Sequence, residues 1–296
     1  MYRGRFAPSP TGPLHFGSLI AACASYLEAK SRGGEWFIRM EDLDLPRCRP
    51  EHATDIEECL ERFGFRHDGA IEYQSQRTAI YEREYARLVR LVYPCGCSRK
   101  DVSEQGEGRY PGTCRKGMAP GKQVRAYRLR VPDERIEFDD ALQGKFGMNL
   151  ETELGDFVLQ RASDRIFSYH LAVVVDDEMQ GVTHIVRGAD LLDSTPRQIY
   201  LQRLLGYRRP EYLHIPVALG ADGDKLSKQT LAPALDPSDV KSLLLSGLRF
   251  LGQNPPSELK GTGLDAIWSW AISHWQVCLI PRAAGLPVQP TRDQSQ

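Results

Sequence analysis

The stretch RFAPSPTGPLHFGSL, residues 5–19, decides the fold. It indicates a short strand that runs through a Pro/Gly turn into a helix, and an apolar stripe of helical spacing continues over residues 19–30. The segment WFIRM, residues 36–40, indicates a second short strand. In a strand, helix, strand unit the helix N-terminus lies at the carboxyl edge of a parallel sheet, where backbone N–H groups favour phosphate. The sequence therefore predicts an α/β fold with a nucleotide site at that edge.

Two residues on the first turn of this helix suit such a site. The imidazole of His15 can hydrogen-bond a phosphate oxygen, and Gly17, which lacks a β-carbon, lets a flat ring such as adenine approach the helix backbone. Taken alone, the His-x-Gly triplet favours a simpler alternative, in which a prolyl turn caps an ordinary helix and His15 lies on the surface.

A second stretch, GADGDKLSKQ at residues 220–229, follows an apolar strand predicted over residues 212–219. Its two lysines, Lys225 and Lys228, lie three residues apart on a Gly/Asp loop. Such a loop can close over a triphosphate and neutralise charge that develops on the α-phosphate and the leaving pyrophosphate. A solvated basic turn is the alternative.

Together the two stretches resemble a known family. PLHFGSL resembles the "HIGH" signature and KLSKQ the "KMSKS" signature of class I aminoacyl-tRNA synthetases, and RFAPSPTG resembles the opening of glutamyl-tRNA synthetases. Ser18 and Gln229 differ from the last residue of each signature. The resemblance implies that His15, Lys225 and Lys228 are catalytic. The ATP-binding residues that it implies are Pro8, His15, Gly17, Ser18, Lys225, Leu226, Ser227, Lys228 and Gln229.

The resemblance also implies a glutamate site. The blocks SYHLAVVVDD and IVRGADLLDSTPRQ match those of glutamyl synthetases, in which Tyr169, Arg187 and Arg5 correspond to residues around the substrate's side-chain carboxylate. Two guanidinium groups and a phenol suit a carboxylate, whereas the neutral amide of glutamine leaves one cation uncompensated. A core tyrosine and an arginine paired with Asp190 are the alternatives. The implied glutamate-binding residues are Arg5, Ala7, Ser9, Glu41, Tyr169 and Arg187.

Glu41 belongs to an acidic group that follows the second predicted strand. A carboxylate at that edge can hold a substrate ammonium, and the resemblance carries this role onto Glu41. Asp42 and Asp44 are equally explained as cap or turn residues.

A polar, Gly/Pro-rich segment holds Cys95, Cys97 and Cys114, which suit zinc as thiolates. Tyr110 is the nearest fourth donor, and water or Glu107 are alternatives. A Cys-x-Cys pair followed by a tyrosine and a third cysteine resembles the zinc site of shortened glutamyl synthetase paralogues. With four protein ligands the site would be structural, because no position stays open for chemistry.

Composition excludes several classes of protein. A hydrophobic content of 41% and a charged content of 26% are typical of a globular chain, and a net charge of -1 excludes a uniformly basic surface. RNA would have to bind local arginine clusters, at residues 83–99, 115–130 and 197–209, although each is also explained as a solvated face. There is neither a long apolar run nor a signal peptide, so we expect a cytoplasmic protein without membrane contact. In that compartment we expect no disulfide framework among the seven scattered cysteines.

The remaining pattern predicts the other elements. LAVVV, residues 171–175, fits a helix or a buried strand, and residues 281–296 should form a loose tail. The helices are predicted over residues 51–63, 79–92, 195–206, 236–252 and 264–275. Strand-like segments between residues 125 and 161 include a hairpin around GKFGMN, residues 144–149, and THIVRG at residues 183–188 indicates a further strand.

These elements predict a Rossmann-like class I synthetase fold that is split by a β-rich, zinc-bearing insertion. Residues 1–94 would form the first half of the catalytic domain, 95–165 the insertion, 166–235 the second half with the lysine loop, and 236–296 a short helical appendage. About sixty residues follow the lysine loop, too few for the anticodon-binding domains of a full-length glutamyl synthetase.

The sequence thus resembles the shortened glutamyl synthetase paralogues. These activate L-glutamate with ATP, without tRNA, and transfer it to the queuosine base of the tRNA(Asp) anticodon. The resemblance implies Mg²⁺ with ATP and a structural Zn²⁺, and we expect a monomer. A truncated glutamyl-tRNA synthetase that charges the tRNA 3′ end and a non-catalytic synthetase-like regulator are the alternatives.

Overall fold

The computed structural model describes residues 1–44, 46–106, 109–220, 223–226 and 233–288. Four residues named above, Glu107, Ser227, Lys228 and Gln229, lie outside these ranges. No helix within the described ranges has both the length and the apolar character that crossing a membrane requires.

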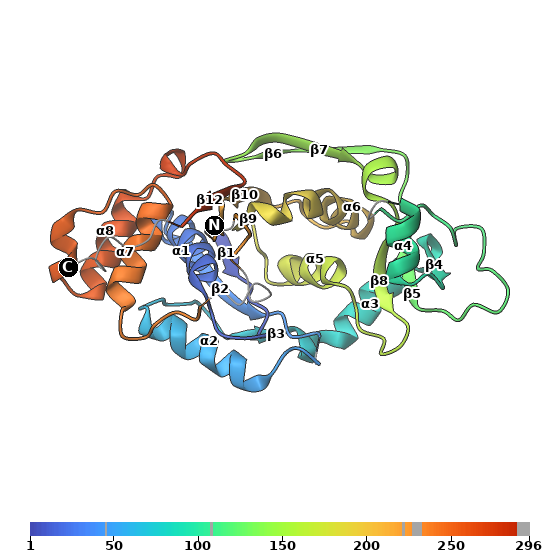
Figure 1. Ribbon diagram of the computed structural model, residues 1–296, viewed down its shortest axis with the longest axis horizontal. Helices are drawn as coiled ribbons and strands as arrows, with labels where there is room; N and C mark the ends of the chain where they lie inside the picture. The colour runs from blue at the N-terminus through green and yellow to red at the C-terminus, as the bar shows by residue number, and fades with distance from the viewer. Residues whose placement is uncertain (45, 107–108, 221–222, 227–232, 289–296) are drawn as a thin grey trace.

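A parallel α/β layer forms the centre of the molecule (Figure 1). Strands β1 (Arg3–Phe6), β2 (Glu35–Met40) and β3 (Glu72–Tyr73) pair in parallel in that order, and β9 (His184–Gly188) pairs in parallel with β10 (Glu211–Ile215). The two groups meet where β1 and β9 begin, because Thr183 N donates to Arg3 O at 3.0 Å and the Tyr2 and His184 rings stack at 4.0 Å. The layer therefore runs β3-β2-β1-β9-β10, and its order reverses beside β1, where such sheets bind ligands.

Helices cover both faces of this layer. Val186 and Leu213 pack into the hydrophobic cluster of α1 (Phe16–Ser31), whereas their neighbours Ile185 and Tyr212 pack into the cluster of α5 (Tyr169–Met179) and α6 (Thr195–Leu205). Successive side chains of a strand point to opposite faces, so β9 and β10 are buried on both sides. LAVVV is thereby assigned to a helix, and α6 ends at left-handed Gly206 as predicted.

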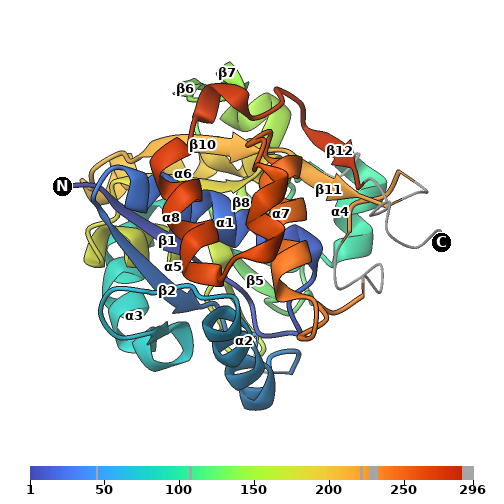
Figure 2. The same ribbon diagram turned by 90° about the vertical axis from the view of Figure 1, so that its left-hand side faces the viewer.

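Helix α1 is buried along most of its length because helices also cover its outer side. Figure 2 shows α7 (Val240–Phe250) and α8 (Leu264–His274) in front of α1. Both were predicted. The surrounding helices α2 (Pro50–Arg62) and α3 (Thr78–Leu88) complete the main body.

The insertion lies at the end of the molecule away from α7 and α8 (Figure 1). Its sheet has the order β4-β5-β8, formed by Val92–Cys95, Ala126–Leu129 and Phe157–Arg161, with α4 (Arg99–Gly106) beside it. The prediction of a helix up to Val92 was wrong at its end, because Val89–Leu91 form one 3-10 turn and β4 follows at once.

A hairpin of the insertion returns to the central layer. Strand β6 (Arg135–Asp140) pairs with β7 (Gly144–Asn149), and Asp140 is also paired with Tyr212 of β10. The prediction had centred this hairpin on GKFGMN, which instead forms the second strand. Asp140 explains the position of the turn, because its Oδ1 accepts from the N–H groups of Leu142 and Gln143.

The tail prediction was also wrong over part of its length. Pro216 separates β10 from β11 (Val217–Leu219), and β12 (Gly285–Pro287) pairs in parallel with β11. Val288 N donates to Leu219 O at 3.0 Å, so this segment holds the strand that leads into the lysine loop. Residues 289–296 of the predicted tail lie outside the described residues.

Candidate active site

The two signature segments are neighbours in the structure. Leu235 N donates to Leu14 O at 3.0 Å, and a β-carbon added at Gly17 would lie 3.3 Å from the carbonyl oxygen of Leu226. The lysine loop therefore approaches the first turn of α1 backbone to backbone, at a position where glycine leaves room. One nucleotide bound at this edge would meet both segments.

His15 is the N-cap residue of α1, and its Nδ1 accepts a hydrogen bond from Ser18 N at 3.3 Å. A neutral imidazole that accepts at Nδ1 carries its proton on Nε2. Nε2–H is therefore a donor suited to an anionic oxygen. Pro8 O accepts from Glu41 N at 2.9 Å, which joins the prolyl turn to the end of β2.

Lys225 lies on the described part of the lysine loop. Its Nζ is 2.5 Å from Oδ2 of Asp190, on the 3-10 helix Ala189–Ser194 after β9. Among the described residues Asp190 forms no ion pair with Arg187, whose guanidinium instead binds His214, Tyr169 and Thr195, so the alternative of an Arg187–Asp190 pair is not supported. Ser227, Lys228 and Gln229 lie outside the described residues, so their predicted roles stay predictions.

Arg187 is 5% exposed, and neutral groups surround its guanidinium. Nε donates to His214 Nε2 at 3.0 Å, Nη2 to Thr195 Oγ1 at 2.8 Å, and Nη1 to Tyr169 Oη at 3.4 Å. A guanidinium has five N–H donors, so these three bonds fix its plane without using them all. Tyr169 and Arg187 are thus brought together as predicted.

Arg5 is 4% exposed and lies in a different environment. Its Nε and Nη2 donate to the two carboxylate oxygens of Asp177 at 3.0 and 3.4 Å. Asp177 also pairs with Arg39, whose Nη1 is 2.9 Å from Oδ1. Nearby Asp176 accepts from Gln74, Arg77 and Tyr81. Arg5 therefore belongs to a buried ionic network that the predictions did not include.

Glu41 lies at the edge of this network, with Oε1 3.5 Å from Arg39 Nη2. Burial raises the pKa of its carboxyl to about 7, Arg39 and Arg5 oppose the rise, and Asp177 and Asp176 add to it. Oε1 is buried without a hydrogen-bond partner among the described residues. A carboxylate in that state is ready to accept a bond from a ligand ammonium.

Glu41, Ser9 and Tyr169 line one cavity of about 670 Å³, which extends toward the insertion. Ala7, also predicted, follows β1 and is half-buried. Beyond Glu41 the cavity wall becomes basic, although Asp44 also lines it. The arginines along it are Arg47, Arg99, Arg125, Arg128 and Arg161.

Sequence patterns alone did not identify Arg39, Asp176 and Asp177 as functional. Asp176 and Asp177 follow the apolar run LAVVV within helix α5, and Arg39 lies in the apolar strand WFIRM. Charged residues within apolar elements are seldom buried unless they are paired, so these three residues carried a signal for a buried network.

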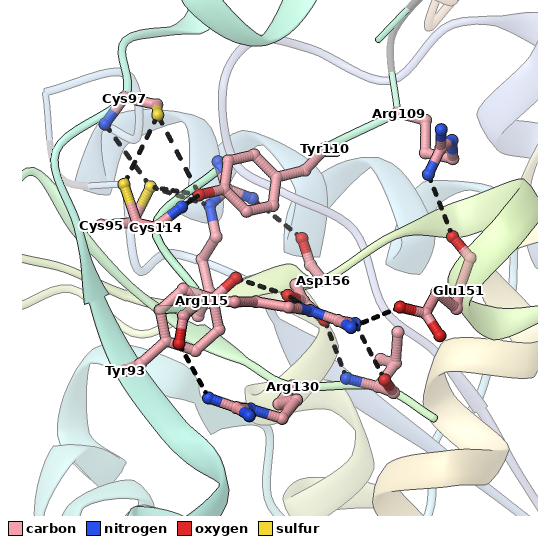
Figure 3. Close-up of polar contacts among 12 residues, drawn as sticks. Tyr93, Cys95, Cys97, Arg109, Tyr110, Cys114, Arg115, Arg130, Glu151 and Asp156 are labelled. Atoms are coloured by element: carbon pink, nitrogen blue, oxygen red, sulfur yellow. Dashed lines mark hydrogen bonds and ion pairs between the residues drawn. The ribbon is translucent and has the colours of Figure 1, made fainter. Parts of the chain in front are cut away.

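The insertion brings the three predicted cysteines together. Their sulfur atoms lie within 4.8 Å of one another, with Cys97 Sγ and Cys114 Sγ 3.7 Å apart. Tyr110 Oη is 3.3 Å from Cys95 Sγ and 4.0 Å from Cys97 Sγ. Figure 3 shows these sulfur atoms and the Tyr110 hydroxyl facing one another.

Charged residues support this cysteine cluster. Arg128 Nε lies 3.3 Å from Cys95 Sγ, and its guanidinium stacks 3.8 Å from the centre of the Tyr110 ring. Arg115, next to Cys114, pairs with Asp156 and Glu151 (Figure 3). Asp156 also accepts from Val131 N, so the cluster is tied to the insertion sheet.

Fold and site together define a class I aminoacyl-tRNA synthetase catalytic domain. Residues 1–258 match the family described as "tRNA synthetases class I (E and Q), catalytic domain". The glutamate tRNA ligase of Elizabethkingia meningosepticum, solved in complex with its amino acid, has a similar fold. The TM-score is 0.78 at 25% identity, over 97% of this chain and 67% of that one.

Curated relatives define the family more narrowly. The glutamyl-Q tRNA(Asp) synthetase of Dechloromonas aromatica is 52% identical over 290 residues, covering 95% of this chain and 96% of the relative. Those of Geobacter sulfurreducens and Pseudomonas aeruginosa are 51% and 50% identical, covering 95% and 97% of this chain and 94% and 97% of the relatives. The chain belongs to the glutamyl-Q tRNA(Asp) synthetase family, and it is a ligase.

Proposed function

We propose that this enzyme activates L-glutamate with ATP, without tRNA, and transfers the glutamyl group to the queuosine base of tRNA(Asp). About 50% identity to several glutamyl-Q tRNA(Asp) synthetases, over 95% of the chain or more, is the observation that carries this proposal. The proximity of Gly17 and Leu226 supports the ATP-binding part of the proposal, because one nucleotide bound at that point would reach both signature segments.

In the first step the α-carboxylate of glutamate attacks the α-phosphorus of ATP. An O–P bond forms, the bond to pyrophosphate breaks, and glutamyl-adenylate results. No protein nucleophile is required, so catalysis consists of positioning and charge stabilisation. Nε2–H of His15 would donate to a phosphate oxygen, and Lys225 and Lys228 would follow the departing pyrophosphate. Mg²⁺ would accompany ATP and neutralise phosphate charge.

The glutamate would lie between Glu41 and Arg187. Its ammonium would approach the buried Oε1 of Glu41, and its side-chain carboxylate would take the unused N–H donors of Arg187 and the Tyr169 hydroxyl. Arg5, Ala7 and Ser9 would complete the wall beside β1. Glutamine would leave the charge of Arg187 unpaired, which disfavours it by several kcal/mol.

In the second step a hydroxyl of the queuosine cyclopentenediol would attack the activated carbonyl, and AMP would leave. The arginine-lined cavity next to Glu41 and Tyr169 is the route that we assign to this nucleotide. Guanidinium groups bind phosphate with two parallel hydrogen bonds, so this wall suits an RNA backbone. A tRNA substrate also favours a cytoplasmic location.

The cysteine cluster would hold a structural zinc ion. Tetrahedral zinc with bonds of about 2.3 Å separates two sulfur ligands by about 3.8 Å, close to the 3.7 Å between Cys97 and Cys114. Cys95 and the Tyr110 hydroxyl would supply the other ligands. Purified protein should contain zinc, and Cys95→Ser should lose it. A metal-free protein, or a Cys95→Ser variant that folds normally, would defeat this assignment.

Pyrophosphate exchange tests activation. Exchange should depend on glutamate and need no tRNA, and Lys228→Ala should slow it by orders of magnitude without changing the melting temperature. Near wild-type exchange in the variant would remove Lys228 from the mechanism. Absence of exchange in the wild type would favour the non-catalytic regulator.

Transfer is tested with two modified tRNAs. A tRNA(Asp) whose terminal ribose has been oxidised should still accept labelled glutamate, whereas one without queuosine should not. The opposite pair of results would identify an enzyme that charges the 3′ end.

A further inference from the structure

The insertion hairpin carries a buried carboxylate that the mechanism above does not use. Asp140, the last residue of β6, is 4% exposed, and its Oδ2 lies 2.6 Å from Nδ1 of His214. The backbone N–H of His214 also donates to Oδ2, at 3.0 Å. Asp140 therefore holds both the ring and the backbone of one residue of β10.

The opposite side of the same imidazole contacts Arg187. His214 Nε2 accepts from Arg187 Nε at 3.0 Å. A neutral imidazole can accept at Nε2 only when its proton is on Nδ1, and a carboxylate at Nδ1 selects this tautomer. With Nε2 protonated, two N–H donors would face each other at that distance.

We propose that Asp140 and His214 are positioning residues for glutamate recognition: the carboxylate fixes the tautomer of His214, and His214 fixes the guanidinium plane of Arg187. This inference rests on the proposed role of Arg187. The insertion would thus contribute to amino-acid selection through its hairpin, besides facing RNA.

Thr195 supports this assignment. Its Oγ1 lies 3.2 Å from Leu191 O and 3.2 Å from His214 Nε2, and it accepts from Arg187 Nη2 at 2.8 Å. Two neighbouring acceptors, one on β10 and one on α6, therefore bind adjacent edges of the guanidinium. Burial and Arg187 lower the pKa of His214, while Asp140 opposes this shift, so the ring is neutral and its Nε2 can accept from Arg187.

Asp140→Asn tests the tautomer directly. An amide N–H at Nδ1 shifts the ring proton to Nε2, so the KM for glutamate in pyrophosphate exchange should rise about tenfold or more. The KM for ATP should stay within about twofold, because Arg187 does not touch ATP. Asp139→Asn, at the exposed neighbouring position of β6, is the matched control and should leave both constants unchanged.

His214→Gln provides a second test. The carbonyl oxygen of a glutamine can accept from Arg187 whether residue 140 is Asp or Asn, because an amide has no tautomer to select. In this background Asp140→Asn should add little to the KM for glutamate. Additive effects of the two substitutions, an unchanged KM in Asp140→Asn, or equal rises for glutamate and ATP would each overturn the proposal.

Two further variants separate an effect on folding from an effect on function. If Asp140→Asn does not fold, His214→Leu is tested in its place, because it lacks the acceptor that His214→Gln keeps. Equal KM values for glutamate in His214→Leu and His214→Gln would overturn the proposal. Arg187→Gln tests the pocket itself. If only Arg187→Gln raises the KM for glutamate, the inference fails and the proposed function stands. If Arg187→Gln does not raise the KM for glutamate, the proposed glutamate site is wrong.

Discussion

Arg5 and Arg187 lie on neighbouring segments of the central sheet and are equally buried, but their partners differ in charge. Both carboxylate oxygens of Asp177 bind Arg5, and Asp177 also pairs with Arg39. Arg187 is held by an imidazole, a hydroxyl and a phenol. Its charge is therefore not neutralised by a direct ion pair within the described part of the chain. A compensated cation maintains the structure, whereas a fixed and uncompensated one is prepared for an anionic ligand.

The largest expected effect is a loss of stability when a cation is removed from the buried ionic network around Arg5. Arg39→Met leaves Asp176, Asp177 and Glu41 buried with less cationic charge, so the free energy of unfolding should fall by about 3–5 kcal/mol. Urea denaturation measures it. The control is Arg47→Met, which breaks the exposed pair with Asp44 and should cost less than about 1 kcal/mol. Similar losses of unfolding free energy in Arg39→Met and Arg47→Met would show that the buried network is no more important for stability than an exposed pair.

The next largest effect is a loss of activity when Arg187, whose charge has no direct ion pair among the described residues, is replaced. Arg187→Gln should lower kcat/KM for glutamate about 100-fold, because a charged hydrogen bond to the substrate is lost, and should narrow the preference for glutamate over glutamine. Its unfolding free energy should change less than that of Arg39→Met. Exchange assays with both amino acids measure the preference. An unchanged preference would assign selection to another residue.

The raised pKa of Glu41 predicts that both glutamate binding and stability depend on pH. Its pKa is raised from 4.5 to about 7, so it becomes neutral as the pH falls below that value and attracts an ammonium less. The KM for glutamate should therefore rise as the pH is lowered from about 8 to about 6, by at most about tenfold per unit. The folded state binds this proton more tightly than the unfolded state, so the Glu41 contribution to stability falls as the pH rises from about 4.5 to about 7. In Glu41→Gln both dependences should disappear, and a persistent slope would implicate another group.

The sequence indicated candidate substrate-binding residues, but not the residues that hold them in place. His15 and Gly17 were predicted because a turn, a helix start and a signature coincide in one short segment. The structure places Gly17 beside the carbonyl oxygen of Leu226, so the two signature segments are neighbours. Tyr169 and Arg187 were predicted from the resemblance, and they are hydrogen-bonded.

The supporting residues were missed because pairing across elements leaves no local pattern. Asp140 and His214 lie far apart in the sequence, on strands that pair only after folding. Arg39 on β2 and Asp177 on α5 are also far apart in the sequence, and although a charge within an apolar segment indicated a buried pair, it did not indicate the partner. The strand Gly285–Pro287 was missed for a similar reason, because the strand that it pairs with precedes it by more than sixty residues.

The smallest effect concerns Lys225. Its ion pair with Asp190 is 45% exposed on the lysine side, so the pair is worth about 0.2–1 kcal/mol. If Lys225 leaves Asp190 to reach a phosphate, Asp190→Asn removes a competitor of ATP. The KM for ATP should then fall by no more than about fivefold, the factor that corresponds to this range. The melting temperature and the KM for glutamate should stay close to wild type. A higher KM for ATP would instead mean that Asp190 holds Lys225 in its productive position. The Lys225–Asp190 pair would then have a structural role, like the buried pair of Arg5 and Asp177.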